Sequence, residues 1–245
     1  MKASRFEFRF RVPIIVLLFL VGFQAPWTWT AGRYSPPAST AWLAIPTTLA
    51  RWGWLRLDRA TLLVTGLAIL SGFLGAALRI WGTAYLSAGV VHSATMRGEQ
   101  MMAAGPYRYM RNPLYLGSFF MALSVAILMP PSGAVVFLVL IAVFYFRLIL
   151  SEEDFLAGKI GEPYLEFRKR VPRLMPGFRA RIPPSIARPE WVTSLVAETL
   201  PVTYPVCLAV LAWRYEPELL IRCLLICFGL SLVTRALLPR KIAPA

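Results

Sequence analysis

The sequence predicts an all-α, polytopic integral membrane protein with about six transmembrane helices. Hydrophobic residues make up 58% of the 245 residues, and the mean hydropathy is +0.61. Soluble domains contain roughly 45–50% apolar residues, so this composition indicates a membrane protein. The apolar residues are also gathered in runs close to the ~20 residues that a helix needs to cross a bilayer. Lys and Arg flank these runs, as they do in the cytoplasmic loops of membrane proteins.

Six apolar segments are expected to form the helices. In order, they cover residues 12–29, 60–86, 114–129, 133–150, 192–213 and 217–238. Only Met129-Pro130-Pro131-Ser132-Gly133 separates the third from the fourth, which predicts a tight helical hairpin. The first segment has the basic start of a signal peptide. We expect it to be retained, because Trp27 and Trp29 after it are typical of an interfacial anchor.

The distribution of the net charge of +14 predicts the orientation of the chain. Basic residues concentrate near both termini and in the connections 87–113 and 151–190. The positive-inside rule therefore predicts cytoplasmic termini, in a cell inner membrane or an endomembrane. The sequence has no long basic arm of the kind that would indicate a nucleic-acid partner. Arg79 and Arg147 fall inside apolar segments, and we expect the carboxylates at 152 and 153 to be their counter-charges.

Two polar clusters interrupt this apolar background. The first is the run Gly105-Pro106-Tyr107-Arg108-Tyr109-Met110-Arg111-Asn112-Pro113-Leu114-Tyr115-Leu116-Gly117, and the second is Glu152-Glu153-Asp154. Because the predicted topology puts both at one membrane face, we expect them to form one site. Simpler interpretations are open: Arg108 and Arg111 as membrane anchors, Asn112 as a helix N-cap, and the acidic cluster as a solvated helix end.

These clusters resemble the signatures of the membrane-embedded isoprenylcysteine carboxyl methyltransferase and phospholipid methyltransferase family. In that family, a loop of the form Gly-x-Tyr-x-x-x-Arg-His-Pro-x-Tyr-x-Gly enters a helix, and a Glu-Glu pair ends the following hairpin. The family's downstream elements resemble Gly161-Glu162-Pro163-Tyr164 and the basic stretch ending at Pro176. The resemblance covers about residues 60–178. Asn112 stands where the family has His, and Asn can hydrogen-bond but cannot carry a charge.

The resemblance implies methyl transfer from S-adenosylmethionine to a lipid-like or isoprenylated acceptor at the cytoplasmic membrane face. It implies that Arg111 and Asn112 act in catalysis, and that Arg173 helps to close the site. No metal-ligand pattern is present in the sequence. The implied cofactor-binding residues are Tyr107, Arg111, Asn112, Pro113, Leu114, Tyr115, Gly117, Glu152, Glu153, Tyr164 and Arg168.

The resemblance also predicts three parts: an N-terminal helix with an external loop (1–59), a methyltransferase core (60–178) and an additional two-helix segment (179–245). An NADPH-dependent membrane sterol or enone reductase, which has an Arg-x-Pro-x-Tyr element, is an alternative, as is a non-catalytic membrane protein with a degenerate site. The acceptor nucleophile stays open between a carboxylate, which needs no base, and an amine, which does. His92 is a candidate base, but a loop histidine without a role is the favoured interpretation. We expect Glu198, in the fifth apolar segment, to be solvated at the interface.

Overall fold

The computed structural model describes residues 2–24, 40–88, 104–177, 179–183, 187–214, 222–223, 225–230 and 233. The regular elements in these ranges are all helical, which confirms the all-α class. They are α1 (Arg5–Arg9), α2 (Arg11–Gln24), α3 (Ala41–Arg51), α4 (Leu57–Ala88), the 3₁₀ turn η2 (Gly105–Arg108), α6 (Pro113–Ala126), α7 (Pro131–Ile160), α8 (Glu162–Arg170), α9 (Trp191–Ala197) and α10 (Thr199–Arg214). His92 lies outside the described residues.

The expectation of six spans is not supported by this part of the chain. Two helices, α4 and α7, are long and apolar enough to cross a membrane, and the bent pair α9–α10 is a third if it is counted as one span. Helices α2 and α6 have 14 residues each, or about 21 Å, against a hydrocarbon core of about 30 Å. The apolar run of the third segment overestimated its helix, because its last residues form a turn. Most of segment 217–238 lies outside the described residues.

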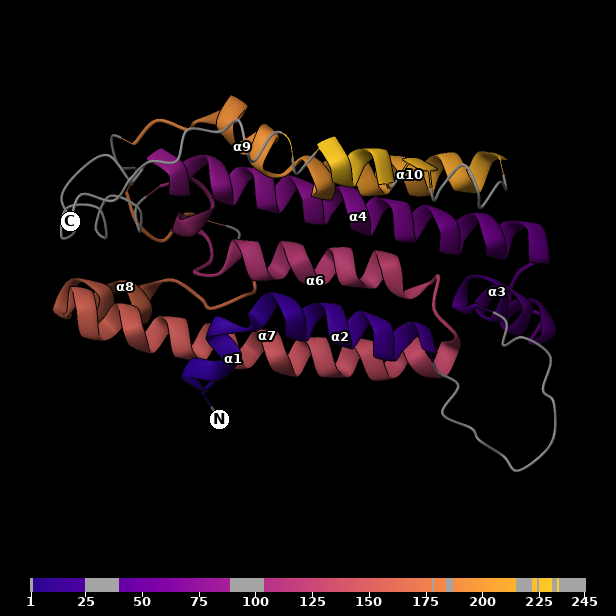
Figure 1. Cartoon of the computed structure of the whole chain (residues 1–245), viewed down its shortest axis with the longest axis horizontal. Helices are drawn as coiled ribbons and strands as arrows, with labels where there is room; N and C mark the ends of the chain where they lie inside the picture. Colours follow the sequence, from indigo (N-terminus) through magenta and orange to yellow (C-terminus); the bar gives the residue numbers. More distant parts are fainter. Residues whose placement is uncertain are drawn as a thin grey trace.

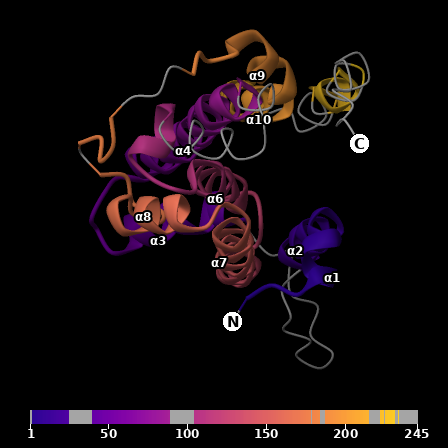
Figure 2. The same ribbon diagram turned by 90° about the vertical axis from the view of Figure 1, so that its left-hand side faces the viewer.

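The long helices are arranged in layers, with α6 between α4 and α7 (Figures 1 and 2). Helix α2 packs on α7, whereas α9 and α10 pack on the other side, against α4. The predicted hairpin is confirmed, because residues 127–130 join α6 to α7 and the two helices are in contact. Helix α10 also reaches past α4, because Tyr204, Leu208 and Leu211 share an apolar cluster with Ile127 at the end of α6.

Helices α4 and α6 cross with their backbones almost touching, at Gly75 and Gly117. A Cβ atom added to Gly117 would lie 2.7 Å from the Gly75 carbonyl oxygen, and one added to Gly75 would lie 2.6 Å from the Gly117 carbonyl oxygen. No side chain fits at such distances, so both positions require glycine. Gly117 therefore serves the contact between the two helices.

Helix α7 continues ten residues beyond the predicted end of its apolar segment, from residue 150 to Ile160. It stops at Gly161, whose φ of 76° and ψ of −141° are accessible almost only to glycine. The Glu152-Glu153-Asp154 cluster consequently lies inside the helix, roughly two turns before its end. The interpretation of this cluster as a helix end is therefore wrong.

The two arginines inside apolar segments have partners that differ from the predicted ones. Arg147 binds Glu7 of α1, with Nη2–Oε2 at 2.8 Å, and Arg79 binds Glu198, with Nε–Oε2 at 2.7 Å. The hydrogen bond from the Arg147 guanidinium lowers the pKa of Glu7 to about 2. Expecting Glu152 and Glu153 as counter-charges was wrong because both true partners are more than a hundred residues away along the chain.

Candidate functional site

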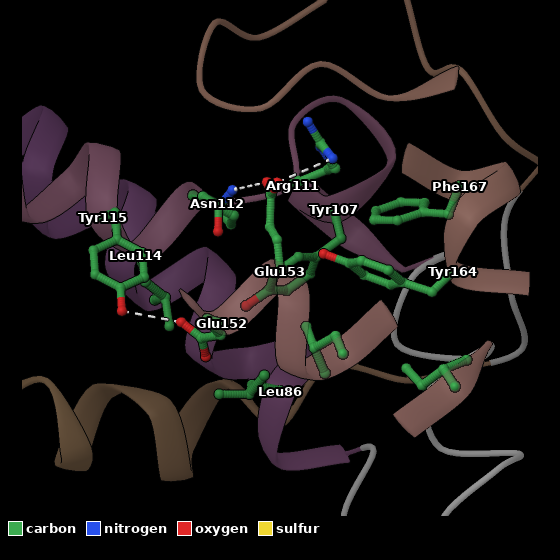
Figure 3. Close-up of a pocket in the computed structure, with 13 residues that line it drawn as sticks. Leu86, Tyr107, Arg111, Asn112, Leu114, Tyr115, Glu152, Glu153, Tyr164 and Phe167 are labelled. Atoms are coloured by element: carbon green, nitrogen blue, oxygen red, sulfur yellow. Dashed lines mark hydrogen bonds and ion pairs between the residues drawn. The ribbon is translucent and has the colours of Figure 1, made fainter. Parts of the chain in front are cut away.

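A cavity of about 100 Å³ lies where the end of α4, the turn η2, the start of α6, the second half of α7 and α8 meet (Figure 3). Its wall combines one arginine, two glutamates and an amide with a larger number of apolar and aromatic side chains. The lining residues are Leu86, Tyr107, Arg111, Asn112, Pro113, Leu114, Tyr115, Glu152, Glu153, Leu156, Ile160, Tyr164 and Phe167. The two polar clusters of the sequence thus meet in one place, as predicted.

The loop that enters α6 is held by a covering segment, which we define as residues 171–177 and 179–182. The backbone N–H of Arg111 donates to the Pro172 carbonyl at 2.9 Å, and that of Asn112 donates to the Arg173 carbonyl at 3.2 Å. Farther along, the N–H of Gly177 donates to the Tyr109 carbonyl at 3.0 Å. These bonds fix the loop backbone, and the side chains at 111 and 112 are directed by it.

Asn112 stands at the N-cap position of α6, but its side chain makes no cap hydrogen bond. Its Nδ2 instead donates to Glu153 Oε1 at 3.0 Å and to the Arg173 carbonyl at 3.2 Å. Both partners are acceptors only, so the amide nitrogen must face them and Oδ1 must point elsewhere. The interpretation of Asn112 as a simple helix cap is therefore wrong.

Glu153 joins three parts of the site. Besides the Asn112 amide, it accepts from Arg173 Nε at 3.1 Å and lies 3.1 Å from Arg173 Nη2 and 3.3 Å from Arg111 Nη1. Its side chain is only 4% exposed. Burying a carboxylate is costly unless it is paired and hydrogen-bonded, and here the covering segment and the α6 loop supply both. Glu153 therefore ties α7 to the loop and to the covering segment.

Glu152 has a different environment from its neighbour. It is half-buried, and its Oε2 accepts a hydrogen bond from the Tyr115 hydroxyl at 3.0 Å. Figure 3 shows its carboxylate on the side of the cavity away from the Asn112–Glu153–Arg111 cluster. No cation within the described residues forms an ion pair with Glu152 in the structure. Its charge is thus open to a cationic ligand.

Arg111 is buried without its full complement of acceptors. The side chain is 8% exposed, yet neither Nε nor Nη1 has a hydrogen-bond partner, because the 3.3 Å approach of Nη1 to Glu153 lacks hydrogen-bond geometry. Burial lowers the pKa of this guanidinium, and the nearby Glu153 carboxylate opposes that effect. Buried donors are nearly always paired in proteins. Two unpaired donors on one guanidinium indicate a place for an anionic or carbonyl oxygen.

Aromatic and aliphatic side chains form the rest of the wall. Burial raises the pKa of Tyr164 to about 12, with a further contribution from Glu153, and burial also raises the pKa of Tyr107. Both phenols are therefore protonated at neutral pH and act as donors. Leu156 and Ile160 extend the Glu152 face of α7 at four-residue spacing, which brings all three into the cavity.

Comparison with known proteins supports the family resemblance of the two polar clusters. Residues 60–162 match the family described as phospholipid methyltransferase. The resemblance predicted from the two clusters is confirmed for this segment. The chain is also 30% identical over 88 residues to a protein-S-isoprenylcysteine O-methyltransferase of Schizosaccharomyces pombe. That match covers 36% of this chain and 37% of the relative, so it spans only about a third of the relative's length. No solved structure matches the chain.

Nine of the eleven predicted cofactor-binding residues, all within or just beyond the segment that matches this family, line the cavity. Gly117 does not, because it lies at the crossing with α4, and Arg168 is exposed on α8. Four further residues belong to the wall but were not predicted: Leu86, Leu156, Ile160 and Phe167. The helical spacing from Glu152 could have identified 156 and 160, whereas nothing in the sequence marks Leu86.

Proposed function

We propose that this protein transfers a methyl group from S-adenosylmethionine to a lipid-like or isoprenylated acceptor. The observation that carries the proposal is that one cavity holds both the unpaired donors of the buried Arg111 and the unneutralised carboxylate of Glu152. The two charges are opposite and come from the two clusters that resemble the methyltransferase family. The family match over residues 60–162 supports the reaction class.

The charges fit the amino-acid end of S-adenosylmethionine. Its carboxylate would accept from Arg111 Nε, which has no hydrogen-bond partner in the structure. Its ammonium group, or a ribose hydroxyl, would donate to Glu152, with the Oδ1 atom of Asn112 as a second acceptor. In this assignment Glu153 is a positioning residue, because the protein's own donors already surround it.

The apolar wall has a second role. The sulfonium of S-adenosylmethionine supplies an activated methyl group, so the protein mainly has to hold the acceptor in line with it and exclude water. Tyr164 and Phe167 of α8 cover the cavity with Leu156 and Ile160 beneath them. The cavity of about 100 Å³ is well below the roughly 300–1,000 Å³ of ligand pockets. We therefore expect the cavity to widen when a ligand enters, with Gly161 between α7 and α8 as the hinge.

The nature of the acceptor is inferred from the bases that the described residues, which do not include His92, place at the cavity. Protonated Tyr107 and Tyr164 cannot take a proton at neutral pH, and Glu153 is engaged by cations. A carboxylate nucleophile, as the name of the S. pombe relative implies for that enzyme, needs no base. An amine, as in a phospholipid headgroup, would have to lose its proton to Glu152. The environment of the site therefore favours a carboxylate on an apolar molecule.

Calorimetry with purified protein tests the proposal. We expect binding of S-adenosylmethionine and of its demethylated product, and no binding of NADPH. Glu152→Gln should weaken both interactions, while Arg168→Gln, outside the cavity, serves as the matched control. Transfer of a labelled methyl group to S-farnesylcysteine, compared with transfer to vesicles of an aminophospholipid, then distinguishes the acceptors. Heat with NADPH alone would refute the methyltransferase assignment in favour of a reductase.

A further inference from the structure

A second ionic cluster lies between α4, α6 and the break that separates α9 from α10. Arg79 of α4 and Glu198 form a two-pronged ion pair, with Nε–Oε2 at 2.7 Å and Nη2–Oε1 at 2.9 Å. Glu198 is 6% exposed, which overturns the expectation that it would be solvated at the interface. It stands at the break between α9 and α10, where the helix axis bends by 64°. Ionised groups at such positions are rare in membrane proteins and are commonly functional.

The ion pair continues as a chain of hydrogen bonds that ends at the cavity. Arg79 Nη1 donates to Ser118 Oγ of α6 at 2.7 Å, and Ser118 Oγ donates to the Leu114 carbonyl at 2.8 Å. Leu114 belongs to the first turn of α6, and its side chain lines the cavity. On α4, Thr83 Oγ1 donates to Glu198 Oε1 at 2.9 Å. Glu198 is thus connected through Arg79 and Ser118 to Leu114, a residue of the cavity wall.

Helix α9 and the residue that precedes it also fix the end of α4 that lines the cavity. Ser194 Oγ donates to the Ile80 carbonyl at 2.7 Å, and the backbone N–H of Glu190 donates to the Ala84 carbonyl at 3.0 Å. On its other side, Gly82 approaches Leu114 so closely that an added Cβ would lie 2.8 Å from Leu114 Cδ2. Helix α9 therefore holds α4 by polar bonds at the level where α4 touches the first turn of α6.

We propose that Glu198 is a positioning residue for the active site, acting through Arg79 from outside the segment that matches the family. This inference rests on the proposed function. A buried ion pair is a weak source of stability, because desolvation offsets the attraction between the charges, and an apolar pair of similar volume often does as well. What an apolar pair cannot reproduce is a directed bond from Arg79 to Ser118, which sets the position of the first turn of α6 relative to α4.

The test separates stability from positioning with three variants: Glu198→Gln, Arg79→Met, and Arg79→Met combined with Glu198→Leu. Each single variant should melt at a lower temperature and bind the demethylated product at least about fivefold more weakly. The double variant should recover most of the melting temperature but not the affinity, because the bond to Ser118 is still missing. Thr65→Val, which removes a hydrogen bond between α4 and Trp42 elsewhere on α4, should lower the melting temperature without changing the affinity. If affinity follows melting temperature across all four variants, the positioning role is refuted.

A distance measurement keeps this outcome separate from a failure of the proposed function. Spin labels at Ala77 of α4 and Lys159 of α7, in a background without native cysteines, report the separation of these two helices. Both positions are exposed. Glu198→Gln should shift or broaden the distance distribution, and Thr65→Val should not. If the wild type binds no methyl donor but the distances change, the proposed function fails while the positioning role stands. An unchanged distribution refutes the positioning role.

Discussion

The two adjacent glutamates of α7 should respond very differently to the same isosteric change. Glu153→Gln removes the charge that faces Arg111 and Arg173, and it turns one acceptor oxygen into a donor among donors. Arg173 is 28% exposed and can turn toward water, but Arg111, at 8%, cannot. Removing one partner of a buried pair costs roughly 3–5 kcal/mol. Each kcal/mol lowers the melting temperature of a protein of this size by about 2–4 °C, so a fall of roughly 6–20 °C is expected.

Glu152→Gln should leave the fold almost unchanged. The new amide oxygen can still accept the Tyr115 hydroxyl, and Glu152 has no cation as partner among the described residues. We expect a change in melting temperature of at most a few degrees. Its effect belongs to ligand binding, where a lost charge-assisted hydrogen bond costs about 1.5–3 kcal/mol, or roughly tenfold to hundredfold in affinity.

The assay is a thermal melt of each variant in detergent, followed by calorimetric titration with the demethylated product. The expected pattern is a low melting temperature with weak binding for Glu153→Gln, and a near-normal melting temperature with weak binding for Glu152→Gln. Equal melting temperatures would show that Glu153 does not hold the loop and the covering segment together. Normal affinity in Glu152→Gln would remove this carboxylate from the ligand site.

Three further predictions follow from local geometry. Gly161→Ala should weaken ligand binding in calorimetry, because a φ of 76° is strained for alanine and α8 would be displaced. The control is Gly158→Ala, which has open space around it within α7 and should stabilise the protein by up to about 1 kcal/mol in a thermal melt. Asn112→His should retain binding in calorimetry, because one ring N–H can replace Nδ2. Asn112→Asp should lose both binding and stability, because it places a second carboxylate against Glu153. Equal behaviour of the two variants would contradict this arrangement. In a cysteine-free background, a cysteine at Ala180 should be labelled by a membrane-impermeant reagent from the cytosolic side and one at Arg56 from the other side; labelling of both from one side would refute the predicted topology.

The convergence of the two polar clusters was predictable because each signal is local. Turn-forming residues before an apolar run mark the start of α6, and the short Pro-containing connection marks the hairpin with α7. A hairpin brings the beginning of one helix close to the end of the next. Once both helices are identified, Asn112 and Glu153 must lie at the same end of the molecule, although their hydrogen bond at 3.0 Å could not be foreseen.

The ion pairs were not predictable for the opposite reason. Arg79 and Glu198 are joined across 119 residues, and Arg147 and Glu7 across 140. Nothing in the spacing of these residues shows which helices pack against each other, so the carboxylates at 152 and 153, expected on the same membrane face, were chosen as partners. Gly117 was misplaced by similar reasoning, because a glycine needed for close approach does not reveal whether a ligand or another helix approaches it.

The different roles of Glu152 and Glu153 are a direct consequence of the helix that carries them. Successive residues on an α-helix point about 100° apart, so two neighbouring carboxylates have different partners even where both line one cavity. Here Glu153 faces the loop with Arg111 and Asn112, which packs beside the helix. The family resemblance implied that both glutamates bind the cofactor, and both line the cavity. We therefore propose that the Glu-Glu motif within α7 supplies Glu152 to the ligand and Glu153 to the architecture of the site.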